Sequence, residues 1–312
     1  MLKVCFIGLG SIGKRHFRNL VIILKERKQE YVIDAVRSRR GGLPEDIEEI
    51  LHTQYEDTEQ LPEGYDIIFI TNPTVCHYDT ILKVAHCTRH LFIEKPVFRE
   101  YKENISALML SKDGIYYVAC PMRYSPVLTT LKERLENEKV YSVRAISSSY
   151  LPGWRKGVDY REIYSAHREM GGGVTLDLIH ELDYIVWLFG MPERSLHISG
   201  KYSDLETDSD DLAVYLLQYP ELLAEIHIDY FGRENVREIE FFCRDYVIKG
   251  DLIRNILKYV YPDGREEEVE LPAAQNYISE MNAFLDMTEG RRNNFNDIRY
   301  ANQVLRLALE EA

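Results

Sequence analysis

The sequence predicts an α/β fold, with a doubly wound parallel sheet first and then a second α/β domain that contains a large, open and mostly antiparallel sheet. Three observations support this prediction. A glycine-rich turn follows the first apolar run, strand-like and helix-like segments alternate through the first half, and strand-like segments dominate from Arg194 onward. Strands separated by helical segments form right-handed parallel crossovers, which produce a doubly wound sheet. A chain of 312 residues is long enough for two such domains.

Composition limits the possible partners and compartments. The net charge of −13 argues against a general nucleic-acid surface, which needs clustered Lys and Arg. The first apolar run breaks at Gly8, which is too short for a signal peptide, and no later run reaches bilayer length. We therefore expect a cytoplasmic protein with no membrane partner. The five cysteines lack the paired spacing of a zinc site or a disulfide framework, so we expect no metal.

The first two elements flank the glycine-rich turn. Lys3–Ile7 is a short apolar strand, and a helical segment runs from Ser11 to about Lys25. The spacing of the three glycines between them allows a tight turn, close approach of the backbone to a pyrophosphate, and close packing of helix on strand. The helix N-terminus would attract the phosphate charge. A simple glycine-rich turn is the alternative. The predicted cofactor-binding residues here are Gly8, Gly10, Ser11, Ile12 and Gly13.

The second strand, Tyr31–Val36, is expected to end beside the adenosine ribose. An acid there favours the free 2′-hydroxyl of NAD, and a basic residue favours the 2′-phosphate of NADP. The strand continues past Asp34, so we expect this carboxylate to miss the ribose. Arg37, Ser38 and Arg39 follow the strand, and we predict that they bind NADP, with NAD as the alternative cofactor. A solvated basic loop is the other interpretation.

The third predicted strand also ends on polar residues and a proline. It spans Asp66–Ile70 after a polar stretch, and a helix from Val75 to about His86 follows it. In an open parallel sheet, ligands bind outside the carboxyl ends of the strands. The residues at this end that we assign to the cofactor are Thr71, Asn72, Pro73 and His77. Taken alone, His77 would be interpreted as an ordinary helix residue.

The next strand, His90–Ile93, ends abruptly on Glu94, Lys95 and Pro96, and a fifth strand, Ile115–Ala119, completes the sheet. By the same rule, Glu94 and Lys95 are expected to point into the ligand crevice. Pro96 has no N–H and forces Lys95 out of the helical region, and the bond between them is a candidate cis peptide. Two solvated charges at the end of a strand are the alternative interpretation.

The second half begins with a helix and a strand. Ser125 is placed as the N-cap and Pro126 as the first residue of a helix to about Asn137, and Val140–Tyr150 is predicted as a strand. The irregular segment 151–170 is rich in rings and cations, which suit a hydroxylated and also an anionic sugar. The same side chains could instead pack a surface loop over the domain. The predicted substrate-binding residues are Arg123, Tyr124, Trp154, Arg155 and Tyr164.

Three glycines, Gly171–Gly173, end the irregular segment, and Val174–Phe189 is predicted as one amphipathic helix. Asp177, His180 and Asp183 are spaced by three and would project from nearly one face of this helix. A histidine on a helix is ordinarily a hydrogen-bonded core residue. We interpret Asp183, like Glu181, as structural.

Strands dominate from Arg194 onward, and two amphipathic helices, about Asn276–Glu289 and Ile298–Glu311, close the chain. An open sheet with helices on one side leaves a face to be covered. This predicts a homodimer or homotetramer.

These motifs, in this order, resemble the glucose-fructose oxidoreductase, inositol dehydrogenase and MocA family over nearly the whole chain. They are the glycine turn, Asn72-Pro73 with His77, Glu94-Lys95-Pro96, and Gly171–Gly173 leading to Asp177 and His180. The resemblance implies that residues 1–121 form an NAD(P)-binding Rossmann domain and residues 122–312 a substrate-binding and oligomerisation domain. It also implies that Lys95 lies at the nicotinamide and that His180 completes the catalytic pair. Many members place this histidine four residues after the aspartate, whereas the spacing here is three, which leaves open whether Asp177 contacts substrate or only orients His180.

The activity that the resemblance implies is hydride transfer between NAD(P) and a secondary alcohol or ketone of a sugar, a sugar derivative or a cyclitol. His180 would remove the hydroxyl proton, Lys95 would stabilise the developing alkoxide, and Asp177 would fix the histidine tautomer. Two alternatives remain open. The first is a sugar epimerase or lyase that cycles a retained cofactor, and the second is a non-catalytic protein that senses NADP.

Overall fold

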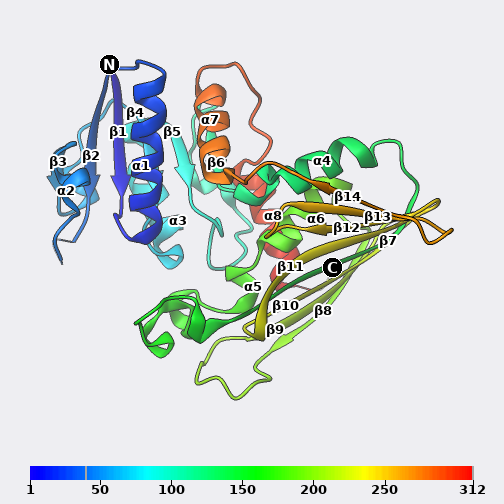
Figure 1. The fold of residues 1–312 in the computed structure, drawn as a ribbon. Coiled ribbons are helices and arrows are strands. Elements are labelled where there is room, and N and C mark those ends of the chain that lie inside the picture. The colour runs from blue at the N-terminus through cyan, green and yellow to red at the C-terminus, as the bar shows by residue number, and fades with distance from the viewer. Residues whose placement is uncertain (39–40, 311–312) are drawn as a thin grey trace. The chain divides into compact units, whose positions relative to one another are not determined.

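The computed structural model in Figure 1 describes residues 1–38 and 41–310, which form two compact units. Unit 1 contains Met1–Cys120 and Tyr277–Gln303, and unit 2 contains Pro121–Asn276 and the chain from Val304 onward. The boundary expected at residues 121 and 122 assigns everything after it to one domain. The compact units differ from that division because Tyr277–Gln303 returns to unit 1.

Unit 1 is built on a six-stranded sheet with the order β3-β2-β1-β4-β5-β6, in which every pair of neighbours is parallel. The order reverses between β1 and β4, so the ends of these strands form the switch point of a doubly wound sheet. The strands are β1 (Leu2–Ile7), β2 (Tyr31–Val36), β3 (Leu51–Tyr55), β4 (Tyr65–Ile70), β5 (Thr88–Ile93) and β6 (Tyr116–Val118). The α-helices are α1 (Ser11–Glu26), α2 (Glu45–Glu48), α3 (His77–Val84) and α7 (Asn276–Thr288). The predicted parallel sheet is confirmed.

Aromatic side chains form the centre of unit 1. Phe6, Phe69 and Phe92 are register partners on β1, β4 and β5, and their ring centroids lie 4.4 Å and 5.1 Å apart in succession. Helix α7 adds Phe284, whose ring packs edge-on to Phe92 at 5.2 Å. Such ring pairs add about 0.5–1.5 kcal/mol each beyond the burial of their area. The late helix α7 is therefore part of the core of unit 1.

Strand β3 is the element of this sheet that the sequence-based prediction missed. Leu51–Tyr55 alternates between partly buried and exposed side chains at the edge of the sheet, and three of its five residues are polar. Edge strands with polar side chains lack the continuous apolar run of a central parallel strand. The segment expected as the third strand is therefore β4.

Unit 2 contains an eight-stranded sheet with the order β14-β13-β12-β11-β7-β10-β9-β8. Its neighbours are antiparallel except for β7 and β10, which confirms the predicted open, mostly antiparallel sheet. The strands are β7 (Val140–Tyr150), β8 (Arg194–Gly200), β9 (Leu212–Gln218), β10 (Leu223–Asp229), β11 (Phe231–Cys243), β12 (Val247–Asp251), β13 (Ile256–Val260) and β14 (Glu266–Glu270). The α-helices are α4 (Pro126–Leu135), α5 (Val174–Asp177) and α6 (His180–Phe189), and four short 3₁₀ turns lie within residues 151–170. The division between the two units falls inside α8 (Ile298–Leu309), after Gln303.

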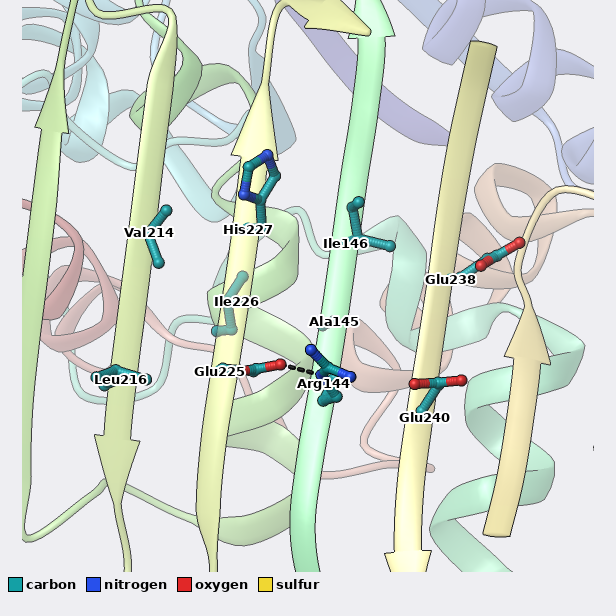
Figure 2. A pocket seen from close by; sticks show the side chains of 10 residues that line it. All are labelled: Arg144, Ala145, Ile146, Val214, Leu216, Glu225, Ile226, His227, Glu238 and Glu240. Carbon is teal, nitrogen blue, oxygen red and sulfur yellow. Dashed lines mark hydrogen bonds and ion pairs between the residues drawn. The ribbon is translucent and has the colours of Figure 1, made fainter.

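The two faces of this sheet differ. Val143, Ala145 and Tyr215 are buried beneath α5 and α6, which pack on β7, β9 and β10. The opposite face is shown in Figure 2, where Arg144 forms an ion pair with Glu225 between apolar side chains that include Leu216. In that view, no described helix or strand covers these side chains. The outer face of the sheet is therefore a broad exposed surface.

Ser125 precedes α4 as predicted, and Pro126 is its first residue. The Ser125 hydroxyl, however, forms no capping hydrogen bond and is a buried group with no hydrogen-bond partner. The predicted N-cap position and first helical residue are confirmed. Among the helices of the described ranges, none has the length and apolar character needed to cross a bilayer.

Candidate functional site

The glycine turn joins β1 to α1 and is shaped by two close approaches of backbone to backbone. Gly8 has a φ of +93°, and a Cβ at this position would lie 2.9 Å from the Asn72 backbone. A Cβ on Gly13 would lie only 2.4 Å from the Gly8 carbonyl oxygen. Thr71 fixes the same turn because its hydroxyl donates to the Gly8 carbonyl at 2.6 Å. Glycine is required here by sterics, as the spacing predicts.

The turn also leaves room for a phosphate group. Gly10 is the N-cap of α1 in an extended conformation, and a Cβ built on it meets no atom within 4 Å. The first turn of α1, which contains Ser11 and Ile12, carries no acidic residue, so its N–H groups and helix dipole present a positive end. This arrangement fits the pyrophosphate of a dinucleotide.

Polar residues lie within β2 and directly after it, and the carboxylate among them, that of Asp34, already has hydrogen-bond partners. Asp34 is buried and accepts hydrogen bonds from Tyr65 Oη at 2.7 Å and from His52. The Arg37 guanidinium donates to the Gly41 carbonyl at 2.7 Å and to Gln54 at 3.3 Å, while Ser38 is exposed. Arg39 lies outside the described residues. Both Asp34 oxygens are therefore bonded within unit 1, and the expectation that this carboxylate misses the ribose stays a prediction.

Asn72 and His77 occupy the end of β4. The Asn72 amide donates to Thr80 at 2.8 Å, and its Oδ1 is a buried acceptor with no hydrogen-bond partner. The amide of a bound cofactor could donate to this oxygen. His77 is buried among backbone carbonyls, with Nδ1 3.2 Å from the oxygens of both Pro96 and Val97 and Nε2 3.0 Å from that of Asn72. Burial lowers the pKa of His77, and the neighbouring carbonyl oxygens act in the opposite direction. Its ring thus links the loop after β4 to the segment after β5, and its assignment to the cofactor stays a prediction.

Glu94 directly follows β5, and both of its carboxylate oxygens accept hydrogen bonds. Oε1 pairs with His16 Nε2 from the second turn of α1, and Oε2 accepts the Lys95 backbone N–H at 3.1 Å. Burial raises the pKa of this carboxyl, but the His16 hydrogen bond and the nearby charges outweigh burial and lower it overall. Glu94 is thus an internal anchor for the segment that carries Lys95, and this geometry does not support a direct contact with the cofactor.

Lys95 follows this anchor and precedes a cis peptide bond to Pro96, as the sequence suggested. His16 is enclosed by the rings of Phe92 and Tyr277, whose centroids lie 4.9 Å and 5.8 Å from its own. Tyr277 comes from α7, so the anchor of Lys95 draws on three separate segments of unit 1. Pro73 is exposed on the loop that follows β4.

In unit 2, the three glycines bring a loop against a short helix. A Cβ on Gly172 would lie 2.1 Å from the Tyr164 carbonyl oxygen, and one on Gly173, where φ is +124°, would lie 2.1 Å from the Asp210 carboxylate. The Asp210 carboxylate in turn accepts the N–H of Thr175, in the first turn of α5, at 2.9 Å. The glycines therefore permit the close contact that places Tyr164 beside α5.

The predicted helix Val174–Phe189 is interrupted. Helix α5 ends at Asp177, Leu178 leaves the helical region with φ −102° and ψ 27°, and α6 begins at His180. The prediction of one continuous helix was wrong, because apolar periodicity does not reveal a local break. Asp177 and His180 are both buried, Asp177 at the end of one helix and His180 at the start of the next.

The Asp177 carboxylate accepts two phenol hydrogen bonds. Tyr164 Oη donates to Oδ1 at 2.7 Å and Tyr230 Oη donates to Oδ2 at 2.6 Å. Partial burial and the carboxylate raise the pKa of Tyr164, and deep burial raises that of Tyr230 well above its usual range. Tyr230 was not predicted as a site residue, because in the sequence it continues the apolar alternation of β10.

Asp183 and Glu181, which follow on α6, form buried ion pairs. Arg123 donates to both oxygens of Asp183 at 2.8 Å and 2.6 Å, and only 2% of the arginine is exposed. Glu181 pairs with Arg237 Nε at 2.7 Å. The structural interpretation of the two acids agrees with these pairs. The assignment of Arg123 to substrate is not supported by this geometry, since its fork is occupied.

The remaining predicted substrate residues lie around the irregular loop. Trp154 donates its indole N–H to Ser149 at 2.9 Å, and its ring packs edge-on to Tyr230 at 5.2 Å. Arg155 is exposed, whereas Arg161 of the same loop is paired with Asp159 and Glu206. Tyr124 is half-buried in the turn before α4. In the part of the chain that the structure describes, no group of three His, Cys, Asp or Glu side chains could hold a metal ion.

Known proteins share both halves of this arrangement. Among curated relatives, the scyllo-inositol 2-dehydrogenase (NAD(+)) of Bacillus subtilis is 26% identical over 205 residues, or 64% of this chain and 57% of the relative. The 2,7-anhydro-N-acetylneuraminate hydratase of Mediterraneibacter gnavus is 22% identical over 223 residues, or 68% of this chain and 58% of the relative. The chain thus spans less than two thirds of the length of these relatives.

A solved structure shows the same fold over nearly the full length. The UDP-N-acetylglucosamine 3-dehydrogenase of Acidithiobacillus ferrooxidans superposes with a TM-score of 0.78 at 19% identity, covering 99% of this chain and 95% of that one. Residues 2–118 match the profile described as "Oxidoreductase family, NAD-binding Rossmann fold", and residues 128–248 match that of the GFO/IDH/MocA C-terminal domain. The chain therefore belongs to the GFO/IDH/MocA oxidoreductase family, as its motifs indicated.

Proposed function

We propose that this protein is an NAD(P)-dependent dehydrogenase or reductase that acts on a secondary alcohol or ketone of a sugar, a sugar derivative or a cyclitol. The observation that carries the proposal is the carboxyl edge of the unit 1 sheet. There, a turn that fits a pyrophosphate lies at the switch point, and β5 is followed by Lys95, whose backbone N–H donates to the Glu94 carboxylate. The scyllo-inositol and UDP-N-acetylglucosamine dehydrogenases among its relatives support this substrate class.

In this proposal, each residue of the site has a separate role in the reaction. The nicotinamide, when bound, supplies the hydride acceptor or donor. The glycine turn would hold the pyrophosphate, and Asn72 offers a free acceptor to the cofactor amide. Lys95 would stabilise negative charge on the substrate oxygen, and His180 would take the hydroxyl proton as general base. Asp177 would orient His180.

Cofactor binding is the first test of this proposal. We expect fluorescence titration of the purified protein to show binding of both nucleotides and tighter binding of NADPH, because Arg37 and exposed Ser38 follow β2 while Asp34 is bonded within the sheet. Ser38→Asp would then weaken NADPH and spare NADH. Tighter NADH binding by the unmodified protein would make the basic segment a surface loop. If neither nucleotide binds, the proposed function is wrong.

A second activity is favoured by one relative. The similarity to a protein named as a hydratase suggests a reaction in which a retained cofactor is reduced and reoxidised within each cycle. A dehydrogenase changes absorbance at 340 nm in proportion to product, whereas such a cycle leaves it unchanged at completion. Binding without turnover of any sugar would instead favour a sensor of NADP.

We further propose that the protein forms a homodimer or homotetramer through the outer face of the unit 2 sheet. This face mixes the Arg144–Glu225 ion pair with exposed apolar side chains such as Leu216 (Figure 2). Ile198 on β8 is the register partner of Val214, which lines the same face, and it is 68% exposed. We expect light scattering to give a multiple of the monomer mass, and Ile198→Glu to reduce it. Ile22→Glu, at an exposed position on α1 of unit 1, is the matched control. A monomeric mass for the unmodified protein would contradict the proposal.

A further inference from the structure

The conformation of the irregular loop, residues 151–170, depends on a second loop of unit 2. The last part of the irregular loop, residues 160–170, is built from three 3₁₀ turns of three residues each. Turns this short form few internal hydrogen bonds, so many of their backbone groups need partners from elsewhere in the chain. The loop that joins β8 to β9 supplies several of these partners, and both loops lie near α5 in Figure 1.

The contacts come from the segment Glu206–Asp210 of this second loop, which we call the clasp. Asp208, at its centre, binds the irregular loop twice. Its backbone N–H donates to the Ala166 carbonyl at 3.0 Å, and its carboxylate accepts the Arg168 N–H at 2.7 Å. The second of these bonds involves a charged group and is therefore the stronger one. Asp208 thus holds two neighbouring turns of the irregular loop at once.

The two residues on either side of this centre make contacts of unequal value. The Ser209 hydroxyl donates to the Ser165 carbonyl at 2.8 Å, and both serines are at most 1% exposed. Glu206 pairs with Arg161 at 3.1 Å, but both side chains are more than half exposed. An exposed ion pair of this kind contributes little. Most of the stabilisation by the clasp is therefore expected from Asp208 and Ser209.

The end of the clasp holds the helix that follows the glycine triplet. The Asp210 carbonyl accepts the Val174 N–H at 2.9 Å, and its carboxylate accepts the Thr175 N–H at 2.9 Å. Val174 and Thr175 are the first two residues of α5, which ends at Asp177. One short segment thus binds both the irregular loop and α5.

Tyr164 and Asp177 meet between these two attachments. The Tyr164 hydroxyl donates to the Asp177 carboxylate at 2.7 Å. Tyr164 directly precedes Ser165, whose carbonyl the clasp binds, and Asp177 is the last residue of α5. Tyr164 is 37% exposed, so a substrate can approach it. The position of this accessible phenol therefore depends on the clasp.

We propose that the clasp holds the irregular loop in the conformation that binds substrate, and that Asp208 and Ser209 are positioning residues in it. This inference rests on the proposed dehydrogenase function. Without the clasp, the loop adopts its binding conformation in only a fraction of the molecules, and the apparent affinity for substrate falls by that fraction. The chemical step in the bound complex is unchanged. The clasp therefore acts on KM and not on kcat.

The test compares Asp208→Ala and Ser209→Ala with Asp204→Ala, which changes an exposed acid of the same loop outside the clasp. We expect Asp208→Ala to raise the KM of the sugar by about tenfold or more, as for the loss of a hydrogen bond to a charged group. Ser209→Ala should raise it less, because its hydrogen bond is between neutral groups. Turnover at saturating sugar and the dissociation constant of NADH should not change in either variant, and Asp204→Ala should resemble the unmodified protein.

A conservative variant separates positioning from a general loss of stability. Asp208→Asn keeps an acceptor oxygen for the Arg168 N–H and should restore a nearly normal KM. A variant that is merely less stable loses active protein, which lowers the apparent kcat and leaves KM as it was. That result for Asp208→Ala would overturn the inference.

Hydrogen exchange followed by mass spectrometry tests the clasp without turnover. The amides of residues 160–170 should exchange faster in Asp208→Ala than in the unmodified protein, and at the unmodified rate in Asp204→Ala. Unchanged exchange in Asp208→Ala, or faster exchange with an unchanged KM, would contradict the role of the clasp. Faster exchange in a protein that oxidises no sugar would support the clasp and count against the proposed function alone.

Discussion

Replacing Lys95 with alanine is expected to lower kcat by a factor of about 10²–10³, the usual cost of removing one group that stabilises an oxyanion. Lys95 follows the buried Glu94 anchor, which accepts its backbone N–H at 3.1 Å. A positive charge that the protein supplies beside a developing alkoxide stabilises it more strongly than water does, because water must reorganise first. The dissociation constant for NADH should change far less, because the glycine turn supplies the pyrophosphate contacts.

The matched control for this prediction is Lys102→Ala. Lys102 also belongs to unit 1, and its ammonium lies 2.6 Å from Glu100 and 5.0 Å from the centre of the Tyr78 ring. Steady-state kinetics with the best sugar from a screen, together with fluorescence titration of NADH, would separate turnover from binding. Near-normal turnover of Lys95→Ala would remove this lysine from the mechanism.

Replacing Gly13 with alanine is expected to weaken the binding of both nucleotides at least tenfold. The added Cβ would lie 2.4 Å from the Gly8 carbonyl oxygen and 2.9 Å from Thr71 Oγ1, so α1 must move away from the turn. Overpacking of this kind costs about 1–3 kcal/mol, and here it acts on the N–H groups that would face the pyrophosphate. Titration with NADH and NADPH, with circular dichroism to confirm folding, measures the effect.

Gly42→Ala provides the control for that substitution. A Cβ at Gly42 meets no atom within 4 Å, and Gly42 is not among the residues with positive φ. It should bind nucleotide as the unmodified protein does. Equal affinities for Gly13→Ala and the unmodified protein would mean that the turn adjusts without cost or does not hold the cofactor.

Local signals predicted a large part of this structure. The glycine turn, the polar ends of β4 and β5 and the bounds of β7 follow from periodicity and from residues with special backbone preferences, which act within a few positions. The cis bond before Pro96 belongs to the same class, since only an X-Pro bond adopts this form readily.

Contacts made over long sequence separations could not be predicted in this way. His16 pairs with Glu94 across 78 residues, and Tyr230 reaches Asp177 across 53, with no local pattern that marks either residue. The break between α5 and α6 is also invisible to periodicity, because Leu178 and Ile179 are both apolar. For the same reason, no local pattern in the sequence revealed the partners within the chain that Arg123, His77 and Glu94 have.

The return of α7 to unit 1 has a consequence for the order in which the chain can fold during synthesis. Glu280 of this helix is fully buried and accepts the Tyr117 hydroxyl at 3.0 Å and the Cys120 N–H at 2.5 Å, and Phe284 packs on the ring of Phe92. A ribosome that has released residues 1–120 has completed all six strands of the first sheet but none of these contacts. The side chains that α7 covers stay exposed on the nascent sheet until about 150 further residues have been synthesised. The first domain to emerge is thus among the last to be finished.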